Sequence, residues 1–317
     1  MSVIYWCPAR NIPTGGVRVI YRHADVMNTL GVDAQIYHWH NPAFACSWFE
    51  HQSRIKRDRT LHLKKDFSIL PEGVSVEIGQ KLHAVGAKYG LFVQNSVYAL
   101  FGGKNTQAKA VAEAYRAADL ILTISDHTTA FVKQVFPQVD VNKIVQLTPS
   151  VRGVTPGRKR KIITYMPRKL PRHAGFIEEI GHHLLPPTWK LRSIDKMTQE
   201  QVFAHLAESA IFISLSEFEG LGLPPIEAAL AGNLVVGYTG EGGDEYFDLP
   251  QFTRVHTGDM LGLFKALQDA IVCAEAGVLQ SPEMKQANER LRAMYSEEAE
   301  RQSLMRLKEK IGEVMGQ

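Results

Sequence analysis

The sequence has few of the features that mark disulfide-bonded, metal-binding or membrane-spanning proteins. Three cysteines (Cys7, Cys46 and Cys273) occur in 317 residues, and no two of them form a CxxC pair. Neither a disulfide framework nor a zinc site is therefore indicated, and buried thiols in a reducing compartment are the simpler interpretation. No apolar run approaches the roughly 18 residues of a membrane-spanning helix.

The start of the sequence does not have the pattern that predicts a secretory leader. The first residues, MSVIYWCPARNIP, are typical of a short strand that runs into a loop. We therefore expect a cytoplasmic protein. Peripheral attachment to the inner face of a membrane stays open because Arg54, Lys56, Arg57 and Arg59 form a basic run, although a solvated charged face is the simpler interpretation.

The charge balance excludes little but weighs against a nucleic-acid partner. The net charge is +3, which is compatible with anionic nucleotides but weak for a nucleic-acid-binding surface. Hydrophobic residues make up 45% of the chain and charged residues 22%, so a folded globular protein is expected. Twelve histidines occur without an HExxH or similar metal-ligand spacing, and no metal is predicted.

Short apolar runs alternate with amphipathic segments along the whole chain. This alternation predicts parallel sheets covered by helices on both faces. The predicted strands are Val3–Cys7, Ala34–Trp39, Phe67–Leu70, Leu91–Gln94, Leu120–Ile124, Lys143–Leu147, Ile162–Met166, Leu191–Ile194, Ile211–Leu215 and Leu234–Val236. The predicted helices are Val17–Leu30, Thr106–Ala117, His127–Phe136, His173–Leu184, Gln199–Ala207, a short helix containing Glu227, Met260–Ala274 and Glu283–Lys310, the last broken near Tyr295.

A linker divides this alternation into two halves. Residues 148–160, TPSVRGVTPGRKR, are rich in proline, glycine and basic residues and have no apolar period. We therefore expect one Rossmann-like domain over residues 1–150 and a second over 161–296. Residues 297–317 are expected to form a helix that crosses back to the first domain.

The segment over residues 211–238, IFISLSEFEGLGLPPIEAALAGNLVVGY, carries the most chemical information. An apolar strand leads into a glycine-containing turn with Glu219, and a helix with Glu227 begins at two prolines. Proline suits a first helical position because its missing N–H would have no partner there. A helix N-terminus at the carboxyl end of a parallel strand binds anions such as a diphosphate. A carboxylate on that helix can accept hydrogen bonds from a ribose diol, which points to a nucleotide.

The order Glu219-Gly-Leu-Gly-Leu-Pro-Pro-Ile-Glu227 resembles the E-x7-E signature of retaining GT-B glycosyltransferases, especially family 4. The resemblance implies two Rossmann-like domains that face a central cleft, and a nucleotide-diphosphate sugar as donor substrate with no other cofactor. It implies that Glu227 holds the ribose and that Glu219 contacts the donor sugar. The amides near Gly222 and Leu223 would stabilise the departing diphosphate. Two solvated glutamates in an ordinary βαβ unit are the alternative.

Two further segments fit this resemblance. Gly15 and Gly16 follow the first strand and permit close backbone approach and positive φ; the family places such a loop over the donor diphosphate. Arg168, in Tyr-Met-Pro-Arg-Lys, matches a family arginine that grips the phosphates. The family's lysine partner has no clear match, so Lys169 and Arg172 stay alternatives. A solvated basic loop is the alternative interpretation of this segment.

One family feature is missing from the N-terminal half, and one loop is ambiguous. Where many family 4 members carry a histidine near the acceptor, this chain has Gln94 and Asn95, which bind hydroxyls but cannot act as a general base. His127 follows Ser125 and Asp126, either of which is an expected N-cap, so a structural role is favoured for it. Residues 240–246, GEGGDEY, are interpreted equally well as a phosphate-contacting loop or as a flexible turn.

The sequence therefore predicts a metal-independent glycosyltransferase that acts with retention on a saccharide or lipid-linked acceptor, with surface polysaccharide as the default. The acceptor, the sugar and the nucleobase stay open, and a nucleic-acid acceptor is not excluded. A GT-B-shaped sugar-nucleotide epimerase or hydrolase and a non-catalytic nucleotide-sugar-binding module are the alternatives. A phosphorylase would need a pyridoxal-phosphate lysine motif, and a nicotinamide dehydrogenase would need a GxGxxG fingerprint; neither occurs.

Overall fold

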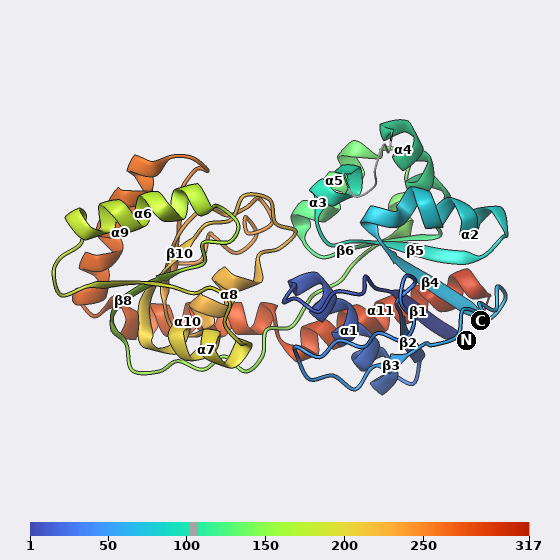
Figure 1. The fold of residues 1–317 in the computed structure, drawn as a ribbon, viewed down its shortest axis with the longest axis horizontal. Helices are drawn as coiled ribbons and strands as arrows, with labels where there is room; N and C mark the ends of the chain where they lie inside the picture. The colour runs from blue at the N-terminus through green and yellow to red at the C-terminus, as the bar shows by residue number, and fades with distance from the viewer. Residues whose placement is uncertain (102–106, 317) are drawn as a thin grey trace. The chain divides into compact units, whose positions relative to one another are not determined.

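The computed structural model describes residues 1–101 and 107–316, which divide into two compact units (Figure 1). Unit 1 comprises Met1–Pro149 and Glu298–Gln317, and unit 2 comprises Ser150–Glu297. The chain therefore builds most of unit 1, then all of unit 2, and returns to unit 1 for its last helix. Thr106, the first residue of one predicted helix, lies outside the described residues.

Unit 1 contains a parallel sheet with strand order β3-β2-β1-β4-β5-β6-β7. Its strands are β1 (Ser2–Trp6), β2 (Asp33–Tyr37), β3 (Arg54–Ile55), β4 (Asp66–Pro71), β5 (Lys88–Val93), β6 (Leu120–Thr123) and β7 (Ile144–Gln146). The interior strands are apolar runs because both faces of the sheet are covered.

Helices cover both faces of this sheet. They are α1 (Gly15–Thr29), α2 (Gln80–Ala84), α3 (Ser96–Phe101), α4 (Ala108–Ala117), α5 (Asp126–Val135) and α11 (Glu297–Met315), with a 3-10 turn at Glu72–Val74, a π-helical turn at Ser75–Gly79 and a 3-10 turn at Val141–Lys143. Residues from α2, α4 and α5 share one core with alternate strand residues.

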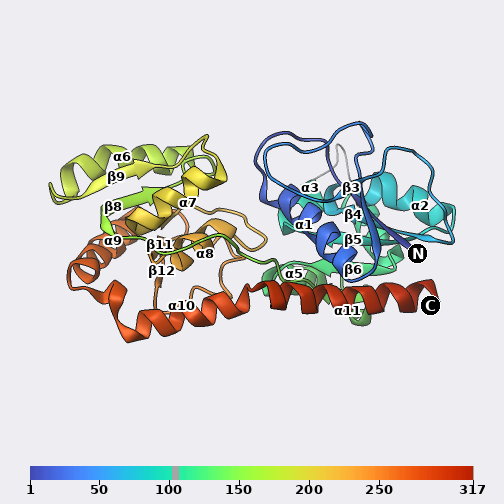
Figure 2. The same ribbon diagram turned by 90° about the horizontal axis from the view of Figure 1, so that it is seen from below.

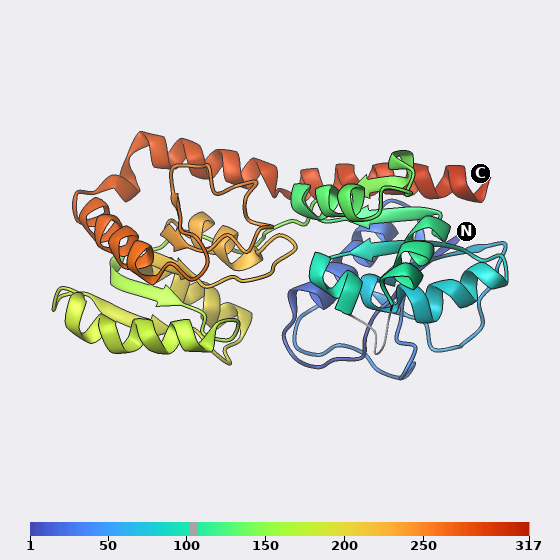
Figure 3. The same ribbon diagram turned by 90° about the horizontal axis from the view of Figure 1, so that it is seen from above.

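A partly buried ion pair joins the last helix to the rest of unit 1. The Arg22 guanidinium on α1 donates from Nε to the Glu300 carboxylate on α11 at 2.9 Å, and the Glu300 side chain is 1% exposed. The Ser303 hydroxyl accepts from the Thr148 N–H at 3.1 Å. Figures 2 and 3 show α11 running along unit 1.

Unit 2 contains a second parallel sheet with strand order β12-β11-β10-β8-β9. Its strands are β8 (Arg160–Tyr165), β9 (Lys190–Ser193), β10 (Ser209–Ser214), β11 (Leu234–Gly237) and β12 (Phe252–Arg254). Its helices are α6 (Pro171–Leu184), α7 (Gln199–Glu208), α8 (Leu223–Leu230), α9 (Met260–Glu275) and α10 (Pro282–Met294), with a 3-10 turn at Val278–Gln280. Figure 1 shows α6 and α9 together on one side of this sheet, and their apolar residues share one core.

The order of the strands locates a ligand-binding edge in each unit. In unit 2 the chain passes from β8 to its neighbour β9 and then crosses to β10 on the other side of β8. In unit 1 the chain runs outward from β1 through β2 to β3 and then crosses to β4 on the other side of β1. Open parallel sheets bind ligands at such switch points, outside the carboxyl ends of the strands.

The predicted strands and helices are present, with ends that differ by a few residues. The long final helix is interrupted as expected, since α10 ends at Met294 and α11 begins at Glu297. The elements that were not predicted are short, and they include β3, β12, α2 and α3. Among the described residues, no helix is both long and apolar enough to cross a bilayer.

Candidate functional site

The switch point of unit 2 is marked by an ion pair between the loops that follow β8 and β10. Lys169 Nζ lies 3.1 Å from Glu219 Oε1, and the two side chains are 33% and 20% exposed. These are the two loops that β8 and β10 direct to the carboxyl edge of the sheet. The structure therefore brings together Glu219 and one of the two alternative basic partners of Arg168.

Arg168 lies in the same loop as Lys169, and its side chain is exposed. Arg172, the other alternative, is an exposed residue of α6. An exposed guanidinium next to a lysine–glutamate pair gives this edge of unit 2 both signs of charge. Such an edge can bind an anion and hydrogen-bond a hydroxyl at the same time.

The helix that carries the second glutamate begins with a left-handed glycine. Gly222 has φ +83° and is the N-cap of α8, and Leu223 is the first helical residue. A side chain at position 222 would be strained by this φ, and its Cβ would lie 2.9 Å from the Tyr246 hydroxyl oxygen. Glycine is therefore required here for both conformation and space.

Glu227 lies in the second turn of α8 and is buried, with 6% of its surface exposed. Glu219 is partly buried in the preceding loop. Neither glutamate has the exposure of a solvated surface residue, so the alternative of two solvated glutamates is wrong in that respect. Burying a carboxylate costs free energy unless polar partners compensate, and ordinary surface helices avoid that cost.

The loop after β11 is packed against the Glu219 loop. The Glu219 N–H donates to the Gly240 carbonyl at 2.9 Å, and Glu219 pairs with Glu241 as an isolated parallel bridge. A Cβ at Gly242 would lie 2.4 Å from the backbone of Gly220. This loop is therefore a support for the neighbouring loop, and its glycines permit close backbone contact within the protein.

Tyr246, at the end of the same loop, was not predicted as a site residue. Its ring is fully buried, and its hydroxyl lies 3.0 Å from the Leu221 carbonyl oxygen and 2.8 Å from that of Gly222. A single tyrosine after a glycine pair has no periodic signal in the sequence. Its contact with residues 221 and 222 arises only when β10 and β11 pair in the sheet.

In unit 1, the paired glycines begin a helix. Gly15 is the first residue of α1, and neither Gly15 nor Gly16 is among the positive-φ glycines of the described residues. The positive φ that we expected for this pair is therefore not observed. Close approach is present within the protein, because a Cβ at Gly16 would lie 3.0 Å from Gln94 Oε1. The Gln94 side-chain amide donates to the Gly16 carbonyl at 3.0 Å.

A buried glutamate supports this edge of unit 1. Glu72 follows β4, next to the switch point, and its Oε1 accepts a hydrogen bond from the Asn95 N–H at 3.0 Å. Burial raises the pKa of Glu72 to about 7. The hydrogen bonds that its carboxylate accepts from backbone N–H groups lower the pKa, but their effect is smaller than that of burial. Glu72 was not predicted, because a lone glutamate after a strand resembles any loop residue.

His127 is the second residue of α5. Ser125 is the N-cap of α5, one of the two residues expected to cap it, and forms a reciprocal capping box with Thr128. The His127 Nε2 atom lies 3.1 Å from the Ser96 hydroxyl. His127 therefore joins the start of α5 to the start of α3.

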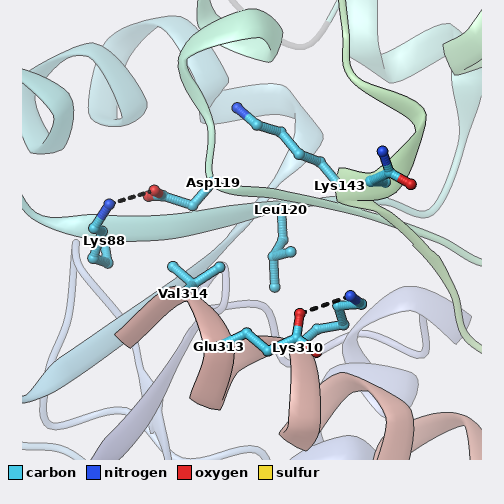
Figure 4. A pocket seen from close by; sticks show the side chains of 8 residues that line it. Lys88, Asp119, Leu120, Lys143, Lys310, Glu313 and Val314 are labelled. Atoms are coloured by element: carbon cyan, nitrogen blue, oxygen red, sulfur yellow. Dashed lines mark hydrogen bonds and ion pairs between the residues drawn. The ribbon is translucent and has the colours of Figure 1, made fainter. Parts of the chain in front are cut away.

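A separate depression lies at the opposite edge of the unit 1 sheet (Figure 4). Its lysines are already engaged: Lys88 pairs with Asp119 at 2.8 Å and Lys310 with Glu313 at 2.7 Å. Lys143 donates to the Ala118 carbonyl at 2.9 Å. This depression lies at the amino ends of β5 and β6, so it is not the ligand edge that the topology defines. Within residues 1–101 and 107–316, no cluster of three potential metal ligands occurs.

The fold is that of known glycosyltransferases. No family model and no curated protein sequence matches the chain. Solved structures do: sucrose-phosphate synthase from Thermosynechococcus elongatus has a TM-score of 0.74 at 12% identity, over 99% of this chain and 99% of that chain. HepE from Anabaena, in complex with UDP, has a TM-score of 0.64 at 10% identity, over 100% of both chains. TarM has a TM-score of 0.56 at 16% identity, over 77% of this chain and 55% of that chain.

These similarities confirm the predicted fold class. Two parallel-sheet α/β units with these structural neighbours define a GT-B fold. The chain spans about half the length of TarM. Because every one of these identities is low, the similarities show the fold and not the activity.

The titration of Glu72 gives a prediction for unit 1. The pKa of Glu72 in the folded protein is raised from an ordinary value near 4.5 to about 7. Between these two pH values the Glu72 carboxyl group is therefore protonated in the folded state and ionised in the unfolded state. Stability is then lost as pH rises from about 4.5 to about 7, by an upper limit of about 3 kcal/mol. We expect the substitution Glu72→Gln to remove this loss, as measured by urea unfolding at pH 5 and pH 8.

The exposed Glu77 lies in the same segment and provides the control. A Glu77→Gln variant should keep the pH dependence of the wild type. If Glu72→Gln and the wild type show the same change in unfolding free energy between the two pH values, Glu72 does not titrate in this window.

Proposed function

We propose that the protein is a retaining glycosyltransferase that moves a sugar from a nucleotide-diphosphate donor to a saccharide or lipid-linked acceptor. The observation that carries the proposal is the Lys169–Glu219 ion pair at the switch point of unit 2. Glu219 precedes the N-terminus of α8, and α8 carries the buried Glu227. The GT-B fold supports it. A neighbour of that fold, HepE, was solved with UDP.

The donor half of the site follows from the chemistry of each group. The Glu227 carboxylate accepts hydrogen bonds from the ribose hydroxyls, and Glu219 accepts from the hydroxyls of the donor sugar. Arg168 and Lys169 neutralise the diphosphate, and the amides of Gly222 and Leu223 donate to it.

Catalysis in this proposal is mainly electrostatic. The bond between the anomeric carbon and the diphosphate oxygen breaks, and its electron pair leaves with the diphosphate. The acceptor hydroxyl oxygen bonds to the anomeric carbon on the face that the diphosphate leaves, and the hydroxyl proton passes to the departing diphosphate. Cations and backbone amides held in place before the reaction stabilise that developing charge without reorganisation. The sugar passes through an oxocarbenium-like transition state, as in other glycosyl chemistry. These groups suffice for the charge, so we propose a metal-independent reaction without another cofactor.

The direct test is to incubate the protein with a panel of sugar nucleotides, each with and without candidate saccharide and lipid-linked acceptors. Release of nucleoside diphosphate only when an acceptor is present, with a glycosylated product of retained anomeric configuration by NMR, is the expected result. Conversion without any acceptor would support an epimerase or hydrolase instead. Binding without turnover across the panel would support a nucleotide-sugar-binding module.

Glu227 gives a prediction about binding. A Glu227→Ala substitution removes charge-assisted hydrogen bonds to the ribose, so it should weaken binding of the nucleoside diphosphate by about 1–3 kcal/mol in calorimetry. Circular dichroism should show an intact fold. The exposed Glu289 of α10 is the matched control, and Glu289→Ala should bind like the wild type. Unchanged affinity in the Glu227 variant would remove this residue from the ribose.

Arg168 gives a prediction about turnover. Its exposed guanidinium contributes little to folding, so Arg168→Ala should leave the unfolding temperature almost unchanged. Loss of a donor to the leaving group should slow release of nucleoside diphosphate by about a hundredfold, measured with the acceptor found above. The exposed Arg158, in the linker segment, provides the control variant Arg158→Ala. Wild-type rates in the Arg168 variant would refute its place at the diphosphate.

A further inference from the structure

The Tyr246 hydroxyl contacts two consecutive peptide groups at the start of α8. Its oxygen lies 3.0 Å from the carbonyl oxygen of Leu221 and 2.8 Å from that of Gly222. The hydroxyl therefore donates its one proton to a pair of neighbouring carbonyls. No other residue type of this shape could reach both carbonyls from an apolar interior, because phenylalanine lacks the donor.

The planarity of the peptide bond converts this contact into an orientation of N–H groups. In a trans peptide the carbonyl and the N–H of the next residue point in opposite directions, and the described residues include no cis peptide. Because the Leu221 carbonyl points to Tyr246, the Gly222 N–H points away from it. The Gly222 carbonyl fixes the Leu223 N–H in the same way. Both N–H groups therefore face away from the buried phenol.

The tyrosine itself is held firmly. Its ring lies 5.2 Å from Phe252 and 6.1 Å, edge to face, from Tyr295, measured between ring centroids. Burial is the main cause that raises the pKa of Tyr246 well above its ordinary value, and nearby carboxylates such as Glu219 add to it. The hydroxyl thus keeps its proton at any physiological pH and stays a donor.

The loop needs such an anchor because of its own composition. Glycine at position 222 has φ +83°, and glycine can adopt many other backbone conformations at little cost. Without the phenol, two carbonyls in the protein interior lose their donor, and the two peptide planes are free to turn. An amide contributes to binding an anion only when its N–H already points at the anion.

We propose that Tyr246 is a positioning residue, which acts by fixing the Gly222 and Leu223 amides toward the diphosphate of the donor. The proposal rests on the function proposed above, since it assumes that a nucleoside diphosphate binds at this edge of unit 2. The residue that it assigns, Tyr246, is fully buried and contacts neither the donor nor the acceptor. Its effect is exerted on the diphosphate alone and not on the nucleoside.

That restriction gives the test. The probes are UDP and uridine, or, where the wild type binds another nucleoside diphosphate more tightly, that diphosphate and its nucleoside. Calorimetry on the full chain measures both affinities. A Tyr246→Phe variant should lose about tenfold in affinity for the diphosphate while its affinity for the nucleoside stays unchanged. A merely structural defect would weaken both probes together.

Tyr295 supplies the matched control. It belongs to the same aromatic cluster, and its hydroxyl donates to Glu245 Oε1 at 2.7 Å. A Tyr295→Phe variant therefore removes one buried hydroxyl without touching the carbonyls of residues 221 and 222, and it should keep the wild-type ratio of the two affinities. A Tyr246→Phe variant that also keeps that ratio would overturn the inference.

Two outcomes separate this inference from the proposed function. If the wild type binds none of the nucleoside diphosphates, the proposed function fails before Tyr246 is tested. If the Phe variant does not fold, amide hydrogen exchange on the wild type replaces it. The Gly222 and Leu223 amides should then be protected by the diphosphate and not by the nucleoside, and amides indifferent to both probes would overturn the inference.

Discussion

The unit 2 site depends on a close backbone contact between two loops. The loop after β11 touches the loop after β10 so closely that a Cβ at Gly242 would meet the backbone of Gly220 at 2.4 Å. Because strands β10 and β11 are hydrogen-bonded neighbours, their loops emerge side by side and can support each other. The contact places Glu219 next to Lys169 and leaves the start of α8 resting on Tyr246.

The two units arrive at a similar arrangement by different means. In unit 2 a tyrosine hydroxyl holds the backbone before α8, and in unit 1 the Gln94 side chain holds the Gly16 carbonyl at the start of α1. Both contacts lie at the carboxyl edge, where a parallel sheet binds ligands. A Cβ at Gly222 would lie 2.9 Å from the Tyr246 hydroxyl oxygen, and a Cβ at Gly16 would lie 3.0 Å from the flexible end of Gln94, so position 222 is the more restricted of the two.

Much of the architecture could be predicted from the sequence because buried parallel strands are apolar on both faces. Segments such as Ile211–Leu215 therefore stand out without any knowledge of their neighbours. Strand β3 has only two residues and β12 only three, which is too short for a periodic signal. The acidic pair could be proposed because it belongs to a long ordered motif, and Arg168 because it follows the first strand of the second half, where the resembling family has an arginine. Glu72 and Tyr246 could not, since their importance comes from contacts between segments that are far apart in the sequence.

The discontinuous path of unit 1 has a consequence for how the protein can be divided. Unit 2 is one uninterrupted segment, Ser150–Glu297, whereas unit 1 takes its last helix from the end of the chain. A fragment that ends at residue 149 would lack the Glu300 carboxylate that pairs with Arg22. It would also expose the surface of unit 1 that the buried residues of α11 cover. Unit 2 can therefore be produced by recombinant dissection as a single piece, whereas unit 1 needs both ends of the polypeptide to be joined or co-expressed.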